Sequence, residues 1–150
     1  MVDEQSRLTI IEEKYCFESL VEGSSYRKVF HITEKYMEIF LEQFSDRSPI
    51  HSSSDFAKEH GYLDAVVHGA AYHGFLANFT GMHFPGPNSM TLSVDLRYLA
   101  PSYLNDQLEI CGTIRQKSES SRAVILEVKI NCLNRNILVA SGRIMSRMLK

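Results

Sequence analysis

Four consecutive stretches in the second half of the chain alternate between apolar and polar residues. Between Met90 and Tyr98, for example, every second residue is apolar. This alternation predicts β-strands that bury one face and expose the other. A fifth strand is predicted earlier, and a short extended piece is expected near the beginning of the chain. The predicted strands cover residues 26–32, 90–98, 108–114, 124–130 and 137–148, and the extended piece covers 8–11.

A surface helix is predicted after the first strand. Thr33 is a favourable N-cap residue, and the apolar residues that follow it recur at helical spacing as far as Phe44. Glutamate and lysine side chains occupy the opposite side of this segment. The helix is expected to end near Phe44, because Ser48 precedes Pro49 and a residue before proline disfavours helical backbone.

Two further helical segments are predicted before the alternating half of the chain. A short helical turn is expected over 55–59, capped by one of the serines before it. The segment from Val66 to Met82 carries almost no charge, and small and apolar residues surround its axis. That pattern predicts a long buried central helix. Gly69 and Gly74 weaken it intrinsically and suggest that other backbone approaches closely.

One buried helix followed by four strands with short connections favours an α+β fold. Asn134-Arg135-Asn136 predicts a hairpin turn between the last two strands. An antiparallel β-sheet wrapped around the central helix is the economical arrangement of these elements. The chain has 150 residues, so we expect a single domain over residues 1–150.

Composition narrows the function classes and the compartment. A formal net charge of −2 without blocks of like charge gives no footprint for nucleic acid. No apolar run is long enough to span a bilayer, and the first residues are polar and acidic, unlike a signal peptide. The cysteines are three in number and widely spaced, which favours free thiols in a reducing compartment. We therefore expect a cytoplasmic protein that binds neither membrane nor nucleic acid.

Two neighbouring segments carry the candidate chemistry. Asp46 and His51 stand five residues apart across Pro49, in what is expected to be a loop, and His68-Gly69 follows at the expected start of the central helix. A carboxylate and an imidazole can share proton transfer with a water molecule. A backbone N–H at a helix start can bind a carbonyl oxygen. A zinc site formed by His51, Asp55 and His68 is an alternative, but the compact spacing of zinc motifs is missing.

The order of these motifs resembles the MaoC-like, (R)-specific enoyl-CoA hydratase branch of the hotdog-fold proteins. The pattern of that family is roughly Ser-Gly-Asp-x-Asn-Pro-x-His, then His-Gly, a long helix and a Pro-Gly turn before the sheet. The chain departs from it at Ser45, Ser48 and Ala77, where the family often has glycine, asparagine and serine. The matching segments are Asp46 with Pro49 and His51, His68-Gly69, Phe84-Pro85-Gly86, Tyr98-Leu99-Ala100-Pro101 and Asn105-Asp106.

The resemblance implies reversible addition of water to a trans-2-enoyl thioester, without a cofactor or metal. Asp46 would act as the general base, His51 would hold the same water, and the Gly69 N–H would bind the thioester oxygen. His68 would orient this turn. An acyl tail would lie near Tyr72, Phe75 or Phe79. The remaining substrate-binding candidates are Ala77, Asn78, Pro85 and Gly86.

Three questions stay open at this level. The thioester could be carried by coenzyme A or by an acyl carrier protein. A hotdog thioesterase also needs a carboxylate and a helix-end N–H, and a non-catalytic module that binds acyl thioesters is compatible with the departures at Ser45, Ser48 and Ala77. Hotdog proteins of this kind pair their sheets, so a homodimer or a dimer of dimers is expected, because a single hotdog leaves a long sheet edge exposed.

Overall fold

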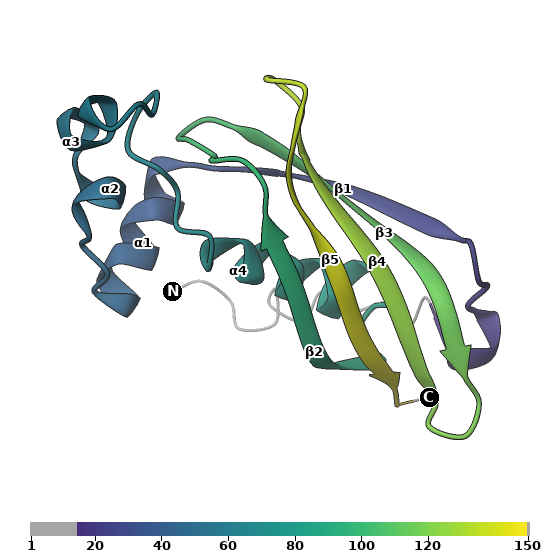
Figure 1. Cartoon of the computed structure of the whole chain (residues 1–150). Helices are drawn as coiled ribbons and strands as arrows, with labels where there is room; N and C mark the ends of the chain where they lie inside the picture. The colour runs from purple at the N-terminus through teal and green to yellow at the C-terminus, as the bar shows by residue number, and fades with distance from the viewer. Residues whose placement is uncertain (1–14, 150) are drawn as a thin grey trace, which may run out of the picture.

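Five antiparallel strands form one curved sheet in the order β1-β3-β4-β5-β2 (Figure 1). The computed structural model describes residues 15–149, so the extended piece expected at 8–11 lies outside the described residues. All five predicted strands and the turn at 134–136 are confirmed, and the third and fourth strands are longer than predicted by a few residues. The strands are β1 (Ser25–His31), β2 (Ser89–Tyr98), β3 (Gln107–Ser118), β4 (Ala123–Cys132) and β5 (Ile137–Met148).

The inner face of the sheet supplies most of the core. Along β3 and β4 the side chains alternate strictly between buried and more exposed over most of their length, as the sequence pattern requires. Leu108, Ile110, Leu126 and Val128 have no exposed surface. They pack in one cluster with the buried side of the helix α4 (Ala71–Asn78). The predicted α+β arrangement is therefore confirmed.

Three helices gather at one end of the sheet, beside the beginning of α4 (Figure 1). The helix α1 (Glu34–Phe44) begins at Thr33, whose hydroxyl accepts a hydrogen bond from the Tyr36 N–H at 3.2 Å, as the N-cap prediction requires. Ser53 caps α3 (Ser54–Glu59) in the same way. Between them lies α2 (Pro49–Ser52), which the sequence did not predict. A short 3₁₀ turn, η2 (Phe17–Ser19), precedes the first strand.

The central helix is shorter than predicted. Helical structure begins at Ala71 instead of Val66, and a wide π-helical turn, η3 (Phe79–His83), continues it. The start is displaced because the Val66 and Val67 N–H groups donate to the carbonyls of Ile50 and Ser102, at 2.9 Å each, instead of joining a helix. This extended entry leads directly into the candidate site.

One side of the central helix is exposed, contrary to the prediction of a helix buried all round. Residues 73, 74, 77 and 78 are exposed, whereas the residues between and around them are buried against the sheet. The segment from Val66 to Met82 contains almost no charge, so its sequence does not distinguish the exposed side of the helix from the buried one. No helix within residues 15–149 is both long and apolar enough to cross a membrane.

Candidate active site

Asp46 lies just beyond the C-terminus of α1, in a turn that restrains its carboxylate. The preceding Ser45 closes the helix in the left-handed conformation with φ 54°, which explains why glycine suits this position in the resembled family. The Ser48 hydroxyl donates to Asp46 Oδ1 at 2.5 Å, and the Ser48 N–H donates to the same oxygen at 3.1 Å. These hydrogen bonds, with smaller contributions from His68 and His51, hold the pKa of Asp46 below its usual range. The carboxylate is thus restrained at Oδ1 and open at Oδ2.

His51 stands on α2 and not in the loop that the sequence predicted. Pro49 begins this short helix at its first turn, where a missing N–H has no consequence. The His51 ring is fixed by a hydrogen bond of 2.7 Å between Nδ1 and the Val66 carbonyl. Because a carbonyl can only accept, Nδ1 carries the hydrogen, and in the neutral ring Nε2 is left as an acceptor. The tether also joins α2 to the entry of the central helix.

His68 is buried between the two segments and contacts both. Its Nε2 lies 2.9 Å from the Asp46 backbone oxygen and 3.5 Å from Asp46 Oδ2. Its ring stacks on that of His51, with the centroids 3.9 Å apart. Phe40 contacts the His68 ring as well, at 4.7 Å between centroids. His68 therefore positions Asp46 and His51 relative to one another.

Asp46, His51 and His68 offer ligand atoms that all lie within 4.8 Å of one another, and they are the group within residues 15–149 that could hold a metal ion. Asp55, which the alternative zinc set required, is not among them. One observation counts against a cation here. His68 Nε2 lies 2.9 Å from the Asp46 backbone oxygen, which can only accept, so this nitrogen carries a hydrogen and has no lone pair for a metal. The arrangement suits proton transfer with a water molecule better than metal binding.

Gly69 follows this cluster, two residues before α4 begins. The Tyr98 ring fills the place that a side chain would need, since a Cβ on Gly69 would meet ring carbons at 2.7 to 3.0 Å. No hydrogen bond from the Gly69 N–H is found within residues 15–149. The N–H stands at the beginning of a helix, where the backbone dipoles favour negative charge. It is therefore available to a carbonyl oxygen of a ligand.

A buried ion pair holds the segment on which the entry of the helix rests. Arg135 Nη2 donates to Asp106 Oδ2 at 2.6 Å and to the Pro101 carbonyl at 2.6 Å. The next carbonyl, that of Ser102, accepts the Val67 N–H at 2.9 Å. The Ser102 hydroxyl accepts the Tyr72 hydroxyl at 2.5 Å. The turn between β4 and β5 is thus connected to the residue directly before His68-Gly69.

Two adjoining clefts have the Gly69 and Tyr98 pair in their lining. The larger, of about 740 Å³, is lined by Asp46, His51, His68 and His73 and by aromatic residues of α1. The smaller, of about 320 Å³, is lined by segments around 62–72 and 98–101. Three residues line both: His51, Gly69 and Tyr98. Of the candidate catalytic groups, His51 and Gly69 therefore lie where the two clefts meet, and Asp46 lies in the larger cleft.

The other substrate-binding candidates are spread along the central helix. Tyr72 is buried and lines the smaller cleft. Ala77 and Asn78 lie on the exposed side of α4 and line neither cleft. Pro85 and Gly86 are buried beyond the far end of the helix, where Gly86 adopts φ 96°. The structure thus brings together Asp46, His51, His68 and Gly69, with Tyr72 beside them, and places the remaining candidates elsewhere.

Tyr98, Phe40 and Phe44 line the clefts but were not predicted as site residues. Tyr98 carried a signal, because it begins the aromatic-x-x-Pro segment that matches the family pattern. The two phenylalanines carried none, since their helical spacing predicts packing equally well. Ser48 was noted only as a departure from the family pattern, although it makes both hydrogen bonds to Asp46 Oδ1.

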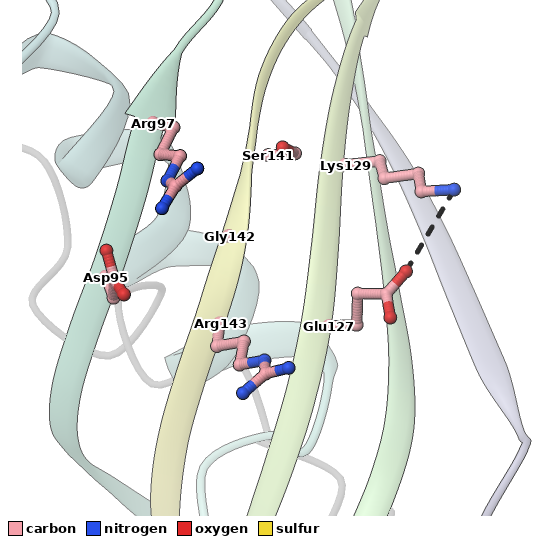
Figure 2. Close-up of a pocket in the computed structure, with 7 residues that line it drawn as sticks. All are labelled: Asp95, Arg97, Glu127, Lys129, Ser141, Gly142 and Arg143. Atoms are coloured by element: carbon pink, nitrogen blue, oxygen red, sulfur yellow. Dashed lines mark ion pairs between the residues drawn. The ribbon is translucent and has the colours of Figure 1, made fainter.

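A further hollow lies on the opposite face of the sheet and is unrelated to this chemistry. It has a volume of about 480 Å³ and lies over β2, β5 and β4 (Figure 2). Its charged side chains are mostly exposed, and Lys129 is 4.0 Å from Glu127. Neither an imidazole nor a cysteine lines it. It contains none of the residues that the sequence singled out.

Two characterised relatives are similar in sequence to part of the chain. A 3-hydroxybutyryl-CoA dehydratase of Methylorubrum extorquens is 32% identical over 71 residues, which are 47% of this chain and 45% of the relative. A mitochondrial 3-hydroxyacyl-[acyl-carrier-protein] dehydratase of Arabidopsis thaliana is 25% identical over 120 residues, 78% of this chain and 70% of the relative. The match thus spans less than half of the first relative. No family model matches the chain.

Solved structures with the same fold include (R)-hydratases and MaoC-like dehydratases. The (R)-hydratase of A. caviae involved in PHA biosynthesis has a TM-score of 0.80 at 20% identity, over 87% of this chain and 98% of that one. An R-hydratase of Pseudomonas aeruginosa gives 0.77 at 21% identity, over 89% and 84%. A MaoC-like dehydratase of Rhodospirillum rubrum gives 0.68 at 15% identity, over 89% and 97%. The fold is therefore the predicted hotdog fold, shared with the proteins that the motifs resemble.

Proposed function

We propose that this protein is a hydro-lyase that reversibly adds water to the double bond of a 2-enoyl thioester, as the MaoC-like dehydratases that it resembles do. The observation that carries the proposal is the meeting of Asp46, His51 and His68 within 4.8 Å, beside the Gly69 N–H, which has no acceptor within residues 15–149. The similarity to two dehydratases of 3-hydroxyacyl thioesters supports the same reaction class.

Asp46 is the general base of the proposed reaction. Its Oδ2 takes a proton from a water molecule that His51 holds through Nε2, and the water oxygen bonds to the β carbon of the enoyl group. The electron pair of the double bond moves toward the thioester oxygen. Asp46 then returns its proton to the α carbon, so that one water is added in all. General acid–base groups of this kind contribute on the order of 10²- to 10⁴-fold.

Gly69 stabilises the negative charge that develops on the thioester oxygen. Its N–H stands at the positive end of α4 and has no acceptor within the described chain. A preorganised donor of this type contributes about 3 to 4 kcal/mol to the transition state in enzymes where one has been removed. The Tyr98 ring against Gly69 keeps the backbone of this turn in place.

The carrier of the acyl group is proposed to be coenzyme A or an acyl carrier protein. The two relatives divide on this point, since one is a dehydratase of a CoA thioester and the other of an acyl-carrier-protein thioester. The free cysteines Cys16, Cys111 and Cys132 fit our proposal of a reducing, cytoplasmic location.

We propose a homodimer, or a dimer of dimers, as the working form. The exposed side of α4 contains small and uncharged residues such as Gly74 and Ala77. The edge strand β2 leaves Met90 and Leu92 about half exposed, at 50% and 48%. Both features need cover in water. Size-exclusion chromatography with light scattering tests this, and a monomer at micromolar concentration would contradict it.

The function is tested by the loss of ultraviolet absorbance of the conjugated enoyl thioester when protein is mixed with crotonyl-CoA or trans-2-octenoyl-CoA. We expect hydration, and we expect Asp46→Asn to reduce kcat/KM at least about 100-fold. Parallel measurement of released thiol separates a thioesterase from a hydratase. Thiol release without hydration, or binding without turnover of either thioester or of its carrier-protein equivalents, would overturn the proposal.

A further inference from the structure

We propose that Ser102 is a positioning residue that holds the Gly69 N–H in place for the thioester oxygen, an inference that rests on the proposed hydro-lyase function. Ser102 is fully buried and follows β2 in the chain. It belongs to the lining of neither cleft, so it does not meet the substrate itself. Its effect on the reaction must therefore pass through the backbone around Gly69.

Ser102 is bonded to the chain on both sides of Gly69. Before the glycine, the Val67 N–H donates to the Ser102 carbonyl at 2.9 Å. After it, the Tyr72 hydroxyl donates to the Ser102 hydroxyl at 2.5 Å. The Tyr72 N–H also donates to the Gly69 carbonyl, at 3.1 Å, and so ties Tyr72 to the glycine. A single residue thus fixes both ends of the short segment that presents the Gly69 N–H.

The start of α4 has no side-chain cap of its own. Ala70 occupies the N-cap position, and alanine is among the less favourable residues there. The peptide group of Gly69 is therefore positioned by contacts from outside the helix. One of these is the Tyr98 ring, which packs against Gly69 and meets the Tyr72 ring edge-on, with centroids 5.9 Å apart. Apolar packing is non-directional, whereas hydrogen bonds prefer a narrow range of angles, so the bonds to Ser102 set the orientation.

The two neighbours of Ser102 in the chain are fixed as well. Arg135 Nη2 donates to the Pro101 carbonyl at 2.6 Å, and the Arg135 guanidinium lies over the Tyr103 ring, 4.9 Å from its centroid. The Tyr103 N–H donates to Asp106 Oδ2 at 2.9 Å. The buried ion pair therefore holds Ser102 from both sides. A donor whose support is fixed in this way is preorganised, so it binds developing charge without a rearrangement.

Tyr72→Phe tests the inference, because it removes the hydroxyl that bonds to Ser102 and keeps the ring. We expect kcat for crotonyl-CoA to fall at least about tenfold, since a misplacement of about 1 Å can cost on the order of 100-fold. KM should change much less than kcat, because the bond to the Gly69 N–H strengthens most in the transition state. Tyr103→Phe is the matched control. It removes the hydroxyl of another buried tyrosine, which accepts the Leu63 N–H at 3.2 Å, and should keep the kcat of the wild type. Equal losses in the two variants would overturn the inference.

The infrared carbonyl stretch of bound butyryl-CoA gives a readout that does not depend on turnover. This saturated thioester has no double bond to hydrate, and a carbon-13 label at its carbonyl separates the band from the amide bands of the protein. A hydrogen bond to the carbonyl oxygen lowers the stretching frequency. We expect a lowered frequency in the wild type and in Tyr103→Phe, and a return toward the value of the free thioester in Tyr72→Phe. A frequency that is the same in Tyr72→Phe as in the wild type would overturn the inference.

The double variant Tyr72→Phe/Ser102→Ala separates positioning from stability. Ser102→Ala alone leaves the buried Tyr72 hydroxyl without its acceptor, whereas the double variant removes both hydroxyls, so its free energy of unfolding should recover. Its kcat should remain as low as that of Tyr72→Phe, and a kcat that recovers together with stability would overturn the inference. The double variant also keeps the test decisive if a single variant does not fold. A wild type that lowers the carbonyl frequency but hydrates neither enoyl thioester would refute the proposed function and not this inference.

Discussion

Asp46 and Asp106 are both aspartates, but their surroundings hold the two carboxylates in opposite ways. Asp46 lies in an exposed turn, whereas Asp106 is held by Arg135 and Asn134 of the β4–β5 turn. The Asp46 side chain is 45% exposed, and its Oδ2 accepts no hydrogen bond within residues 15–149, although His68 Nε2 lies 3.5 Å away. Asp106 is 3% exposed, and both of its oxygens accept hydrogen bonds, from Arg135, Asn134 and the Tyr103 N–H. A carboxylate that is saturated with donors can stabilise a fold but cannot take a proton from water. Only the incompletely bonded one is available for chemistry.

Both carboxylates have lowered pKa values, for different reasons. At Asp46 the Ser48 hydroxyl is the main cause, followed by the Ser48 N–H. At Asp106 burial is the strongest influence and acts to raise the pKa. The hydrogen bonds from Arg135, Tyr103 and Asn134 and the charge of Arg135 outweigh it together, so the pKa lies below its ordinary value. A lowered pKa alone therefore does not distinguish a reactive carboxylate from a structural one.

The largest effect on stability is expected from Asp106→Asn. The change leaves the Arg135 guanidinium largely buried without its counter-charge, and breaking a buried pair on one side costs about 3 to 5 kcal/mol. Urea unfolding at neutral pH measures the free energy of unfolding. Asp46→Asn is the matched control, the same chemical change at an exposed site, and should cost less than about 1 kcal/mol. Equal losses of unfolding free energy in the two variants would contradict the structural role of Asp106.

Acid should remove the contribution of Asp106. Because its pKa is lower in the folded protein than in the unfolded chain, the unfolded state binds the proton more readily. The stabilisation is therefore complete above the unfolded pKa, about 3.9, and is lost as the pH falls through the folded pKa. The stability difference between wild type and Asp106→Asn should shrink below about pH 4 and be constant from pH 5 to 7. A difference that stays constant down to pH 2 would contradict this assignment.

Asn134→Ala should lower the free energy of unfolding less than Asp106→Asn does. Asn134 Nδ2 donates to Asp106 Oδ1 at 3.1 Å, and its side-chain oxygen accepts the Gln107 N–H at 2.9 Å. Removing a hydrogen bond to a charged group costs about 1.5 to 3 kcal/mol. Unfolding in urea gives the value, and Asn78→Ala, the same change on the exposed side of α4 and without a bond to Asp106, is the control. A loss as large as that of Asp106→Asn would mean that Arg135 is not the dominant partner.

The sheet could be predicted from the sequence because its alternation is local and one face is buried. Strands β3 and β4 bury every second residue over most of their length, and nothing else in the chain competes with that pattern. The entry of the central helix could not be predicted. Val66 and Val67 suit a buried helix or an extended segment equally, and the carbonyls of Ile50 and Ser102, distant in sequence, decide between them.

In the candidate site, too, some residues could be predicted from the sequence and others could not. Asp46 and His51 are close in sequence, and their spacing across a proline was sufficient to single them out. Tyr98 lies on an edge strand 29 residues beyond Gly69, and only the folded sheet brings its ring there. The ion pair of Asp106 and Arg135 likewise joins two separate turns. Contacts between distant turns leave no periodic signal in a single sequence.

The smallest effect is expected from Ser48→Ala, which changes how Asp46 is held. The variant removes the hydroxyl that donates to Asp46 Oδ1 and keeps the backbone N–H bond to the same oxygen. Without its main cause the pKa of Asp46 rises, so the acid limb of the kcat/KM profile should move to higher pH. At neutral pH the loss should be below about tenfold, the equivalent of one ordinary hydrogen bond.

Ser48→Asn is the matched variant, since asparagine is common at this place in the resembled family and its amide also donates. It should return the acid limb toward the wild-type position, whereas a purely structural role for Ser48 predicts no movement of the limb in either variant. Unfolding free energies of both variants should stay within about 1 kcal/mol of the wild type, because the turn is exposed. An acid limb that moves to lower pH in Ser48→Ala would contradict the assignment of Asp46 as the general base. In that case the hydroxyl would be acting on a different titrating group.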